Sequence, residues 1–326
     1  MKITVLGAGG WGTALAQLLD LLGHAVTLWG HSPEHLKDVA DARCNTRYLP
    51  GVSLSESLVM ESRLDRAIAA AGCLVIAVPS KAFREVAGLV SDFPGIVVSV
   101  TKGIEHETGL TMCGVLEAMM PRAMISALSG PTLALEVARG IPTAAVVASE
   151  RLAAAEEIQA LFHRPSFRVY SSTDLIGVEL GGALKNVIAI AAGMCDGMGF
   201  GDNSKAALIT RAIVEIRRLG VACGAQPDTF SGLSGLGDLT VTCFSKLSRN
   251  RTLGERLGRG EHLPGILEDT VTVAEGVPTA RSAFRLARRV GVATPIIDEV
   301  HAMLYEGKNI AQALRDLTHR ESRTED

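Results

Sequence analysis

The sequence has little charge imbalance and few aromatic residues. Its 326 residues include 32 lysines and arginines against 35 aspartates and glutamates, a formal net charge of −3. A protein that neutralises nucleic-acid or membrane phosphates needs a basic surplus, so this balance argues against both partners. Aromatic residues make up only 4% of the chain, whereas there are 34 glycines, so we expect an aliphatic core with close turns. The hydrophobic share of 47% excludes intrinsic disorder.

The sequence also lacks a cysteine framework and a long apolar run. Its six cysteines are dispersed and none forms a C-x-x-C pair, which argues against a zinc knuckle or disulfide framework and predicts reduced thiols. The longest apolar run, Ala67 to Val78, is shorter than the ~20 residues of a spanning helix. Four glycines between residues 7 and 12 interrupt the stretch where a signal sequence would be continuous. We therefore expect a cytoplasmic protein with no integral membrane segment.

Short aliphatic runs alternate with amphipathic stretches in the first half of the chain. Helical patterns lie at Thr13–Leu22 and Leu152–Phe162. The expected strands are Ile3–Leu6, Ala25–Trp29, Cys73–Val78, Ile96–Val100, Met124–Leu128 and Ala144–Val147. This alternation predicts an α/β fold with a Rossmann-type, doubly wound and mostly parallel sheet.

The strand pattern ends after about Thr173. The expected helices beyond it are Leu175–Met194, Ser204–Leu219, Thr279–Val290, Pro295–Tyr305 and Ile310–Leu317. Two glycine-rich segments, Cys195–Gly201 and Ser231–Gly237, are expected to be loops. The sequence therefore predicts two domains: a dinucleotide-binding Rossmann domain over residues 1–173 and an all-helical substrate and catalytic domain over residues 174–326.

A glycine-rich motif follows the first expected strand directly. Residues 7–12 read G-A-G-G-W-G and fit G-x-G-x-x-G between a strand and a helix. In this setting Gly7 makes the tight turn, Gly9 lets the backbone approach a pyrophosphate, and Gly12 lets the helix and strand pack closely. The unpaired N–H groups and the dipole of the next helix would hold the anion. The motif predicts that the protein binds NAD(H) or NADP(H).

The acidic residue that would bind the ribose 2′-hydroxyl is missing from the end of the second expected strand, which reads L-W-G-H-S. Without a carboxylate there to repel a 2′-phosphate, His31 and Ser32 could donate to one, so both coenzymes stay open. Residues 31–35 also match the zinc-peptidase pattern H-x-x-E-H. Ser32 and Pro33 instead predict a helix N-cap and first turn, which places His31 before the helix. We expect no metal site.

Several polar residues interrupt apolar segments. Lys102 and Ser129–Thr132 follow successive expected strands at their carboxyl ends, where doubly wound sheets bind ligands. Lys185 lies in an otherwise apolar helix, either as a functional group or as a lysine that extends to solvent. Asp238 is either functional or a helix N-cap, and the donor-rich cluster Ser248–Arg251 is either a ligand site or a solvated helix start.

Taken in order, these motifs resemble those of cytoplasmic NAD(P)-dependent glycerol-3-phosphate dehydrogenases of the bacterial type. The segments that carry the resemblance are GAGGWGTALA from Gly7, TKGIE from Thr101, SGPT from Ser129, ELGGALKNVIAIAAG from Glu179, GLSGLGDLTVTC from Gly232, SRNR from Ser248 and VAEGVPTA from Val273. They cover essentially the whole chain. The resemblance implies reduction of dihydroxyacetone phosphate to sn-glycerol 3-phosphate, a phospholipid precursor. It leaves the oligomeric state open, a homodimer included.

The resemblance also implies roles for particular residues, with Lys185 as the catalytic proton donor and acceptor. The implied substrate contacts are Lys102, Gly130, Thr132, Lys185, Asp238, Ser248, Arg249 and Asn250. The implied cofactor contacts, beyond the glycines of the turn, are Gly10, Trp11, His31, Ser32, Tyr48, Lys102, Ala134, Arg249, Val273 and Glu275. The family usually has a small polar residue in place of Gly10 and often an arginine in place of His31.

The residue types suit this chemistry. Hydride delivery to a ketone carbon creates an alkoxide that needs a proton, which Lys185 can supply. Desolvation and a nearby Lys102 would lower the pKa of Lys185 toward neutrality. Asp238 would hold Lys185 or the substrate hydroxyl in register, and the guanidinium of Arg249 suits a phosphate. Two alternatives stay open: a β-hydroxyacid or sugar-acid dehydrogenase of similar architecture, and a non-enzymatic NAD(P)-sensing module, which needs no base.

Overall fold

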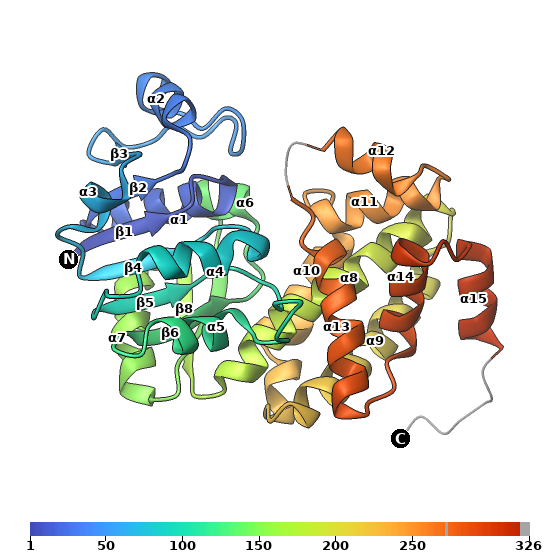
Figure 1. Cartoon of the computed structure of the whole chain (residues 1–326). Helices are drawn as coiled ribbons and strands as arrows, with labels where there is room; N and C mark the ends of the chain where they lie inside the picture. The colour runs from blue at the N-terminus through green and yellow to red at the C-terminus, as the bar shows by residue number, and fades with distance from the viewer. Residues whose placement is uncertain (271–272, 320–326) are drawn as a thin grey trace.

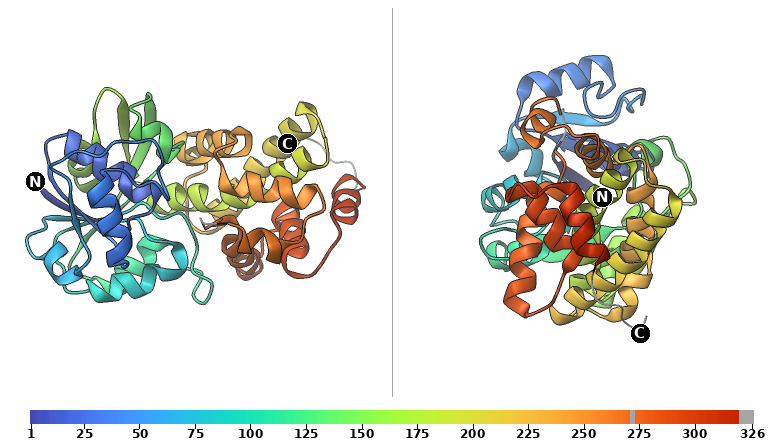
Figure 2. Two further views of the ribbon diagram at one scale, coloured as in Figure 1. Left: turned by 90° about the horizontal axis from the view of Figure 1, so that it is seen from above. Right: turned by 90° about the vertical axis from the view of Figure 1, so that its right-hand side faces the viewer.

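The computed structural model describes residues 1–270 and 273–319 and has two lobes (Figures 1 and 2). The first lobe is built on an eight-stranded sheet in the order β3-β2-β1-β4-β5-β6-β7-β8. Its strands are β1 Lys2–Leu6, β2 Ala25–Trp29, β3 Val59–Glu61, β4 Cys73–Ile76, β5 Ile96–Ser99, β6 Met124–Ser129, β7 Thr143–Ala148 and β8 Phe167–Ser172. All neighbours are parallel except β6 and β7. The mostly parallel, Rossmann-type sheet is confirmed.

Helices cover both faces of this sheet. The helices of the first lobe are α1 Gly10–Leu21, α2 Pro33–Ala42, α3 Leu64–Ile68, α4 Ser80–Leu89, α5 Met112–Met119, α6 Ala134–Ala138 and α7 Leu152–Phe162. Alternate residues of β4 point to opposite faces, so Val75 packs with α1 and α7 whereas Leu74 packs with α4 and α5. The strand order reverses between β1 and β4, and the crevice at the carboxyl ends there is where such sheets bind ligands.

Every expected strand is present, with bounds that differ by at most two residues, but two further strands were missed. β3 is a three-residue edge strand with no buried residue. β8, of sequence FRVYSS, alternates buried and exposed residues because it forms the other edge of the sheet. Neither strand contains the continuous aliphatic run that marks the central strands.

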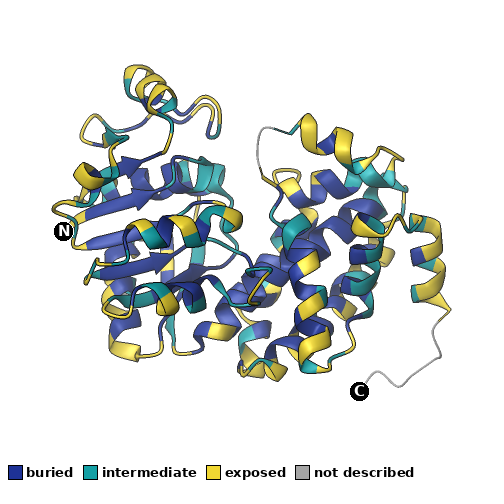
Figure 3. Cartoon of the chain, viewed as in Figure 1, coloured by how far each residue is buried: buried dark blue, intermediate teal, exposed yellow. Residues whose placement is uncertain are grey.

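The second lobe is helical. After α8 Leu175–Gly197, it comprises α9 Asp202–Ala222, a 3-10 turn Pro227–Ser231, a π-helical turn Leu233–Gly237, α10 Asp238–Phe244, α11 Arg249–Gly258, α12 Leu263–Glu268, α13 Gly276–Val290, α14 Pro295–Tyr305 and α15 Ile310–Thr318. Figure 3 shows α8 as a mostly buried rod among the other helices. Within the described ranges, α8 is long and apolar enough to span a membrane, but 94% of its apolar window is buried in the protein. It is therefore the core helix of this lobe.

Glycines let α8 and α11 approach each other closely. A Cβ at Gly193 would overlap the carbonyl oxygen of Arg251, and one at Gly254 would overlap that of Ile190. The loop expected over Cys195–Gly201 is therefore partly wrong, because α8 continues to Gly197, which packs against α11. The loop expected over Ser231–Gly237 is wrong as well, since it consists largely of the π-helical turn that leads directly into α10.

Candidate active site

The glycine turn between β1 and α1 leaves space for a ligand. Gly7 has φ +122°, and a Cβ there would lie 2.7 Å from the carbonyl oxygen of Ala77. A Cβ at Gly12 would overlap the carbonyl oxygen of Gly7, so this glycine lets the helix pack against the turn. Nothing lies within 4 Å of a Cβ built on Gly9, which is the N-cap of α1 and has no side-chain cap. The start of α1 is thus open at Gly9 and is not capped by a side chain, as pyrophosphate binding requires.

A loop from the region after α2 wraps over this turn. The buried Asn45 donates to the carbonyl oxygen of Ala8 at 3.0 Å and to Thr13 Oγ1 at 2.8 Å. A Cβ at Gly10 would lie 2.5 Å from the carbonyl oxygen of Tyr48, so the absence of a side chain at Gly10 allows the loop to approach. Trp11, half-buried on α1, packs against the core of the first lobe.

An acidic residue, Glu34, lies in the first turn of α2, shortly after the carboxyl end of β2. His31 is exposed, and Ser32 caps α2 by accepting from the backbone N–H of His35. His31 therefore precedes the helix, as expected. Ser32 Oγ also donates to Glu34 Oε2 at 3.2 Å. The end of β2 itself carries no acidic residue, as the sequence indicates, but Glu34 in the first turn of α2 places a carboxylate beside Ser32.

Three charged side chains meet where the two lobes face each other. Asp238 is 1% exposed and begins α10. Its Oδ1 lies 2.8 Å from the Nζ of Lys185 on α8, and its Oδ2 lies 2.6 Å from the Nζ of Lys102, which follows β5. Lys185 Nζ also donates to Thr242 Oγ1 at 2.7 Å. One carboxylate thus binds two ammonium groups, one from each lobe.

The surroundings of Lys185 determine its acidity. Burial lowers its pKa to about 8, Lys102 acts in the same direction, and Asp238 opposes both. The side chain of Lys185 is buried at the junction of the lobes, so the reading in which it extends to solvent is wrong. An amine with a pKa near neutrality can both donate and accept a proton under physiological conditions.

Main-chain groups after β6 complete this part of the cleft. Gly130 has φ +136°, and a Cβ there would lie 3.0 Å from the Cα of Ala145. The carbonyl oxygen of Gly130 accepts from Lys102 Nζ at 3.0 Å and from Thr132 Oγ1 at 3.1 Å. These contacts bring Gly130 and Thr132 together with Lys102.

The cluster at the start of α11 divides into buried and exposed residues. Ser248 caps α11 by accepting from the backbone N–H of Arg251. The buried Asn250 donates to Asn186 Oδ1 at 2.9 Å and accepts from the Gly276 N–H at 2.8 Å. Arg249 remains exposed between them. Ser248 therefore begins the helix but is buried, not solvated. Over the described residues, the side chain of Arg249 makes no hydrogen bond or ion pair within the distance limits, although the charge of Glu275 acts on it.

Glu275 connects the two lobes. It accepts from the Ser80 backbone N–H at 3.0 Å and from the Ser80 hydroxyl at the start of α4. Burial raises the pKa of Glu275, while the Ser80 hydrogen bonds and the nearby charge of Arg249 oppose that rise. Of the other expected cofactor contacts, Val273 is exposed and Ala134 is half-buried in α6, which packs on α1.

Four residues of the site were not assigned from the sequence: Asn45, Ser80, Asn186 and Thr242. Thr242 could have been found, because it follows Asp238 by four residues in a short helix and therefore shares its face. Asn186, adjacent to Lys185, points to α11 through its bond to Asn250. Asn45 and Ser80 lie in connections whose partners are distant in sequence, so local patterns carry no signal for them.

A glycine turn in a Rossmann-type lobe, together with a buried lysine in a helical lobe, is typical of an NAD(P)-dependent dehydrogenase with a Rossmann-type half and a helical half. The chain matches the profile of the NAD-dependent glycerol-3-phosphate dehydrogenase N-terminus over residues 2–155 and that of the C-terminus over residues 174–315. It therefore belongs to the NAD-dependent glycerol-3-phosphate dehydrogenase family and is an oxidoreductase that uses NAD(P)H.

Named relatives and solved structures agree with this assignment. A glycerol-3-phosphate dehydrogenase of Chlorobium phaeobacteroides strain BS1 is 48% identical, covering 100% of this chain and 99% of the relative. One from Geobacter sulfurreducens is also 48% identical, covering 99% and 98%. The crystal structure of the Coxiella burnetii glycerol-3-phosphate dehydrogenase superimposes with a TM-score of 0.94 at 35% identity, covering 98% and 99% of the two chains. These findings favour neither of the alternative functions.

The shared carboxylate leads to a first prediction. Asp238→Asn leaves two ammonium groups without a counter-charge, so we expect the free energy of unfolding to fall by about 3–5 kcal/mol at pH 7. Urea unfolding followed by circular dichroism measures this change. Asp298→Asn is the matched control, because Asp298 pairs with the half-exposed Arg288 at 2.8 Å and should cost at most about 1 kcal/mol. Equal losses in the two variants would show that the buried cluster does not depend on Asp238.

Proposed function

We propose that the cleft between the lobes reduces dihydroxyacetone phosphate to sn-glycerol 3-phosphate, with Lys185 as the proton donor. The observation that carries this proposal is the buried Lys185–Asp238–Lys102 cluster, in which Lys102 follows the carboxyl end of β5. The cluster combines a proton donor of suitable acidity with groups that fix its position. A module that only sensed the coenzyme would not need a buried lysine there.

The first lobe supports the coenzyme assignment. Gly9 and the uncapped start of α1 fit a pyrophosphate, with Gly7, Gly10, Trp11 and Gly12 shaping the turn. When bound, the dinucleotide supplies the hydride. Further contacts with the coenzyme are proposed for residues that lie in the chain between the end of β2 and the start of α13. They are His31, Ser32, Tyr48, Lys102, Ala134, Arg249, Val273 and Glu275.

Lys185 is the proposed donor of the proton. Because pH 7 lies below its pKa of about 8, the side chain is mostly an ammonium. The ammonium can donate a proton to the developing substrate alkoxide. Asp238 and Thr242 hold the amine in place from two directions. Lys102, on the other side of Asp238, is placed to bind the substrate oxygen and to keep the pKa of Lys185 low. No metal is required for this proton transfer.

The substrate phosphate is assigned to the start of α11. Arg249 is exposed and presents a planar fork that matches phosphate geometry. Ser248 and Asn250 flank it at the N-terminus of a helix, where backbone N–H groups also favour an anion. Gly130 and Thr132 are proposed to contact the other end of the substrate near Lys102.

We also propose that residues 1–173 and 174–326 act as the coenzyme domain and the substrate domain. The product would supply glycerophospholipid synthesis in the cytoplasm, without an integral membrane segment and without nucleic acid as a partner. The enzyme is proposed to be a homodimer or a monomer. Gel filtration with light scattering distinguishes the two states.

The acidity of Lys185 gives the second prediction. The reduction needs its ammonium form, so kcat/KM for dihydroxyacetone phosphate should fall as pH rises through about 8, whereas glycerol 3-phosphate oxidation should gain over that range. Absorbance at the nicotinamide band measures both directions. Lys185→Ala should lower kcat by about 10²–10⁴-fold with the coenzyme Kd unchanged. A collapse of coenzyme binding with kcat preserved would contradict the assigned role.

The phosphate assignment gives the third prediction. Arg249→Gln removes a charge-assisted hydrogen bond, so KM for dihydroxyacetone phosphate should rise by about 10–100-fold. Arg211→Gln on the exposed face of α9 is the control for lost charge and should leave KM unchanged. Comparable turnover of unphosphorylated dihydroxyacetone by the unaltered enzyme would reject the proposed substrate.

Coenzyme choice gives the fourth prediction. We propose that both NADH and NADPH are accepted and that Glu34 disfavours the 2′-phosphate by charge repulsion. Glu34→Gln should raise kcat/KM for NADPH relative to NADH by about fivefold or more. Asp38→Asn, an exposed change on the same helix, should leave the ratio where it was. If both variants shift the ratio equally, the effect is one of net charge and Glu34 has no specific role.

A further inference from the structure

A second group of cationic side chains lies on α13, away from the cleft. Arg281, Arg285, Arg288 and Arg289 follow one another at helical spacing, so they share one side of the helix, and all four are exposed. Gly276, at the other end of α13, contacts Asn250 in the cleft. At ~1.5 Å per residue, the arginines end roughly 20 Å along the helix from Gly276.

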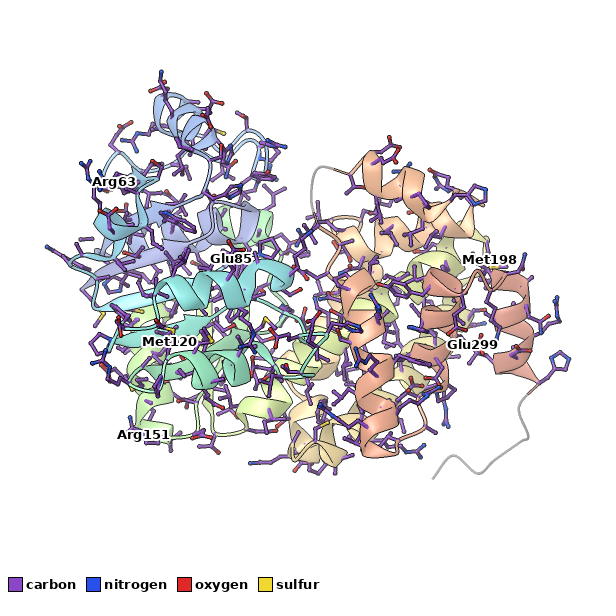
Figure 4. All side chains as sticks on the ribbon, viewed as in Figure 1. Arg63, Glu85, Met120, Arg151, Met198 and Glu299 are labelled. Carbon is purple, nitrogen blue, oxygen red and sulfur yellow. The ribbon has the colours of Figure 1, made fainter. Side chains whose placement is uncertain are left out.

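A turn from the first lobe faces these arginines. An isolated bridge between Ile104 and Thr111 closes the turn, and the Gly109 N–H donates to the carbonyl oxygen of Glu105 at 2.8 Å. Two hydrogen bonds of 2.6 Å from Arg84 on α4 hold the carboxylate of Glu105. The turn is therefore fixed to the first lobe. Figure 4 shows side chains of both lobes where the lobes face each other.

The turn and α13 are in direct contact. Arg285 Nη1 lies 2.9 Å from His106 Nε2, and Arg289 Nη1 donates to the carbonyl oxygen of Thr108 at 2.6 Å. Gly109 has φ +71°, and a Cβ there would lie 2.6 Å from Arg289 Nη2. A cavity of about 300 Å³ lies between the turn and the helix, lined by His106, Thr108, Arg285, Arg288 and Arg289 among others.

The positive charge around this cavity is incompletely neutralised. Arg288 pairs with Asp298 at 2.8 Å and stacks on the ring of Phe284. Over residues 1–270 and 273–319, no carboxylate lies within ion-pair distance of Arg285 or Arg289, whose contacts are with an imidazole and with backbone carbonyls. Glu107 is the one acidic residue among the described lining residues. A cavity of this charge favours an anion.

We propose that this cavity is a second anion site, which binds a small phosphate-bearing ligand such as a phosphate monoester or a diphosphate. Arginine forks match phosphate oxygens in geometry and charge, and Arg285 and Arg289 approach from one side of the cavity. Because His106 and Thr108 belong to the first lobe and α13 to the second, a bound anion bridges the lobes. The site would therefore regulate how firmly the cleft stays closed, through contacts that leave the reacting groups untouched.

His106 provides a local reporter of binding. Burial lowers its pKa, as do the charges of Arg281 and Arg285, whereas Glu107 acts in the opposite direction. A dianion in the cavity would offset the two arginines and raise the pKa of His106. This shift is observable by NMR titration of the histidine ring and does not depend on turnover.

The test uses sodium pyrophosphate as the probe. Saturating NADH occupies the glycine turn, and the Arg249→Gln protein is the background, so that the proposed substrate site is weakened. Isothermal titration calorimetry should show one binding event, and adding Arg285→Gln should weaken it by about 10-fold or more. Arg217→Gln, an exposed arginine of α9, is the matched control and should leave the affinity unchanged. Arg289→Gln, which removes the other arginine assigned to the phosphate, provides a second variant should Arg285→Gln unfold at a lower temperature.

The proposal would be overturned by no binding in the Arg249→Gln background, or by equal binding with and without Arg285 and Arg289. An unchanged pKa of His106 at saturating pyrophosphate would do the same. Glycerol 3-phosphate in one arm and phosphatidylcholine vesicles with phosphatidic acid in another distinguish a soluble metabolite from a lipid headgroup as the source of the phosphate. All readouts are of binding, so they stand apart from any failure of the Lys185 mechanism.

Discussion

The site depends on the two ion pairs that Asp238 makes with Lys185 and Lys102. The carboxylate of Asp238 is almost wholly buried and contacts Lys185 from the helical lobe and Lys102 from the sheet lobe. Two ammonium groups this close would repel each other and would not remain in a buried place without the shared anion. The same carboxylate therefore keeps the lobes in register, stabilises the charge of Lys185 against burial and leaves its pKa low enough for proton transfer.

The sequence predicted the parts of this arrangement that local patterns encode. The central strands are continuous aliphatic runs, and the glycine turn has a recognisable spacing, so both were found in place. The edge strand β8 and the π-helical turn before α10 were not, because an alternating edge strand and a glycine-rich helix resemble loops. Asn45 and Ser80 bond to residues far away in the chain, and only the folded structure brings those partners together.

The site residues show a similar limit. These residues belong to motifs that together cover essentially the whole chain. A motif does not distinguish a residue that binds a ligand from one that fixes the position of a neighbouring residue. Asn250 uses its amide to join α8 and α13, and Ser248 uses its hydroxyl to cap α11, so Arg249 is the exposed donor between them. Glu34 was passed over because it lies beyond the strand end, although the helix turn returns it to Ser32.

Helix α13 explains how the two lobes can be coupled at more than one place. Glu275, directly before it, accepts hydrogen bonds from Ser80 at the start of α4, while Arg289 near its end donates to the turn that follows Lys102. A rigid helix held to the same lobe at both ends cannot pivot at one contact without straining the other. A movement that lifts the whole of α13 from the first lobe would therefore break the Glu275 contact and the arginine contacts together, whereas a rotation about the line that joins them would not. A ligand that binds either end consequently changes the free energy of opening at both.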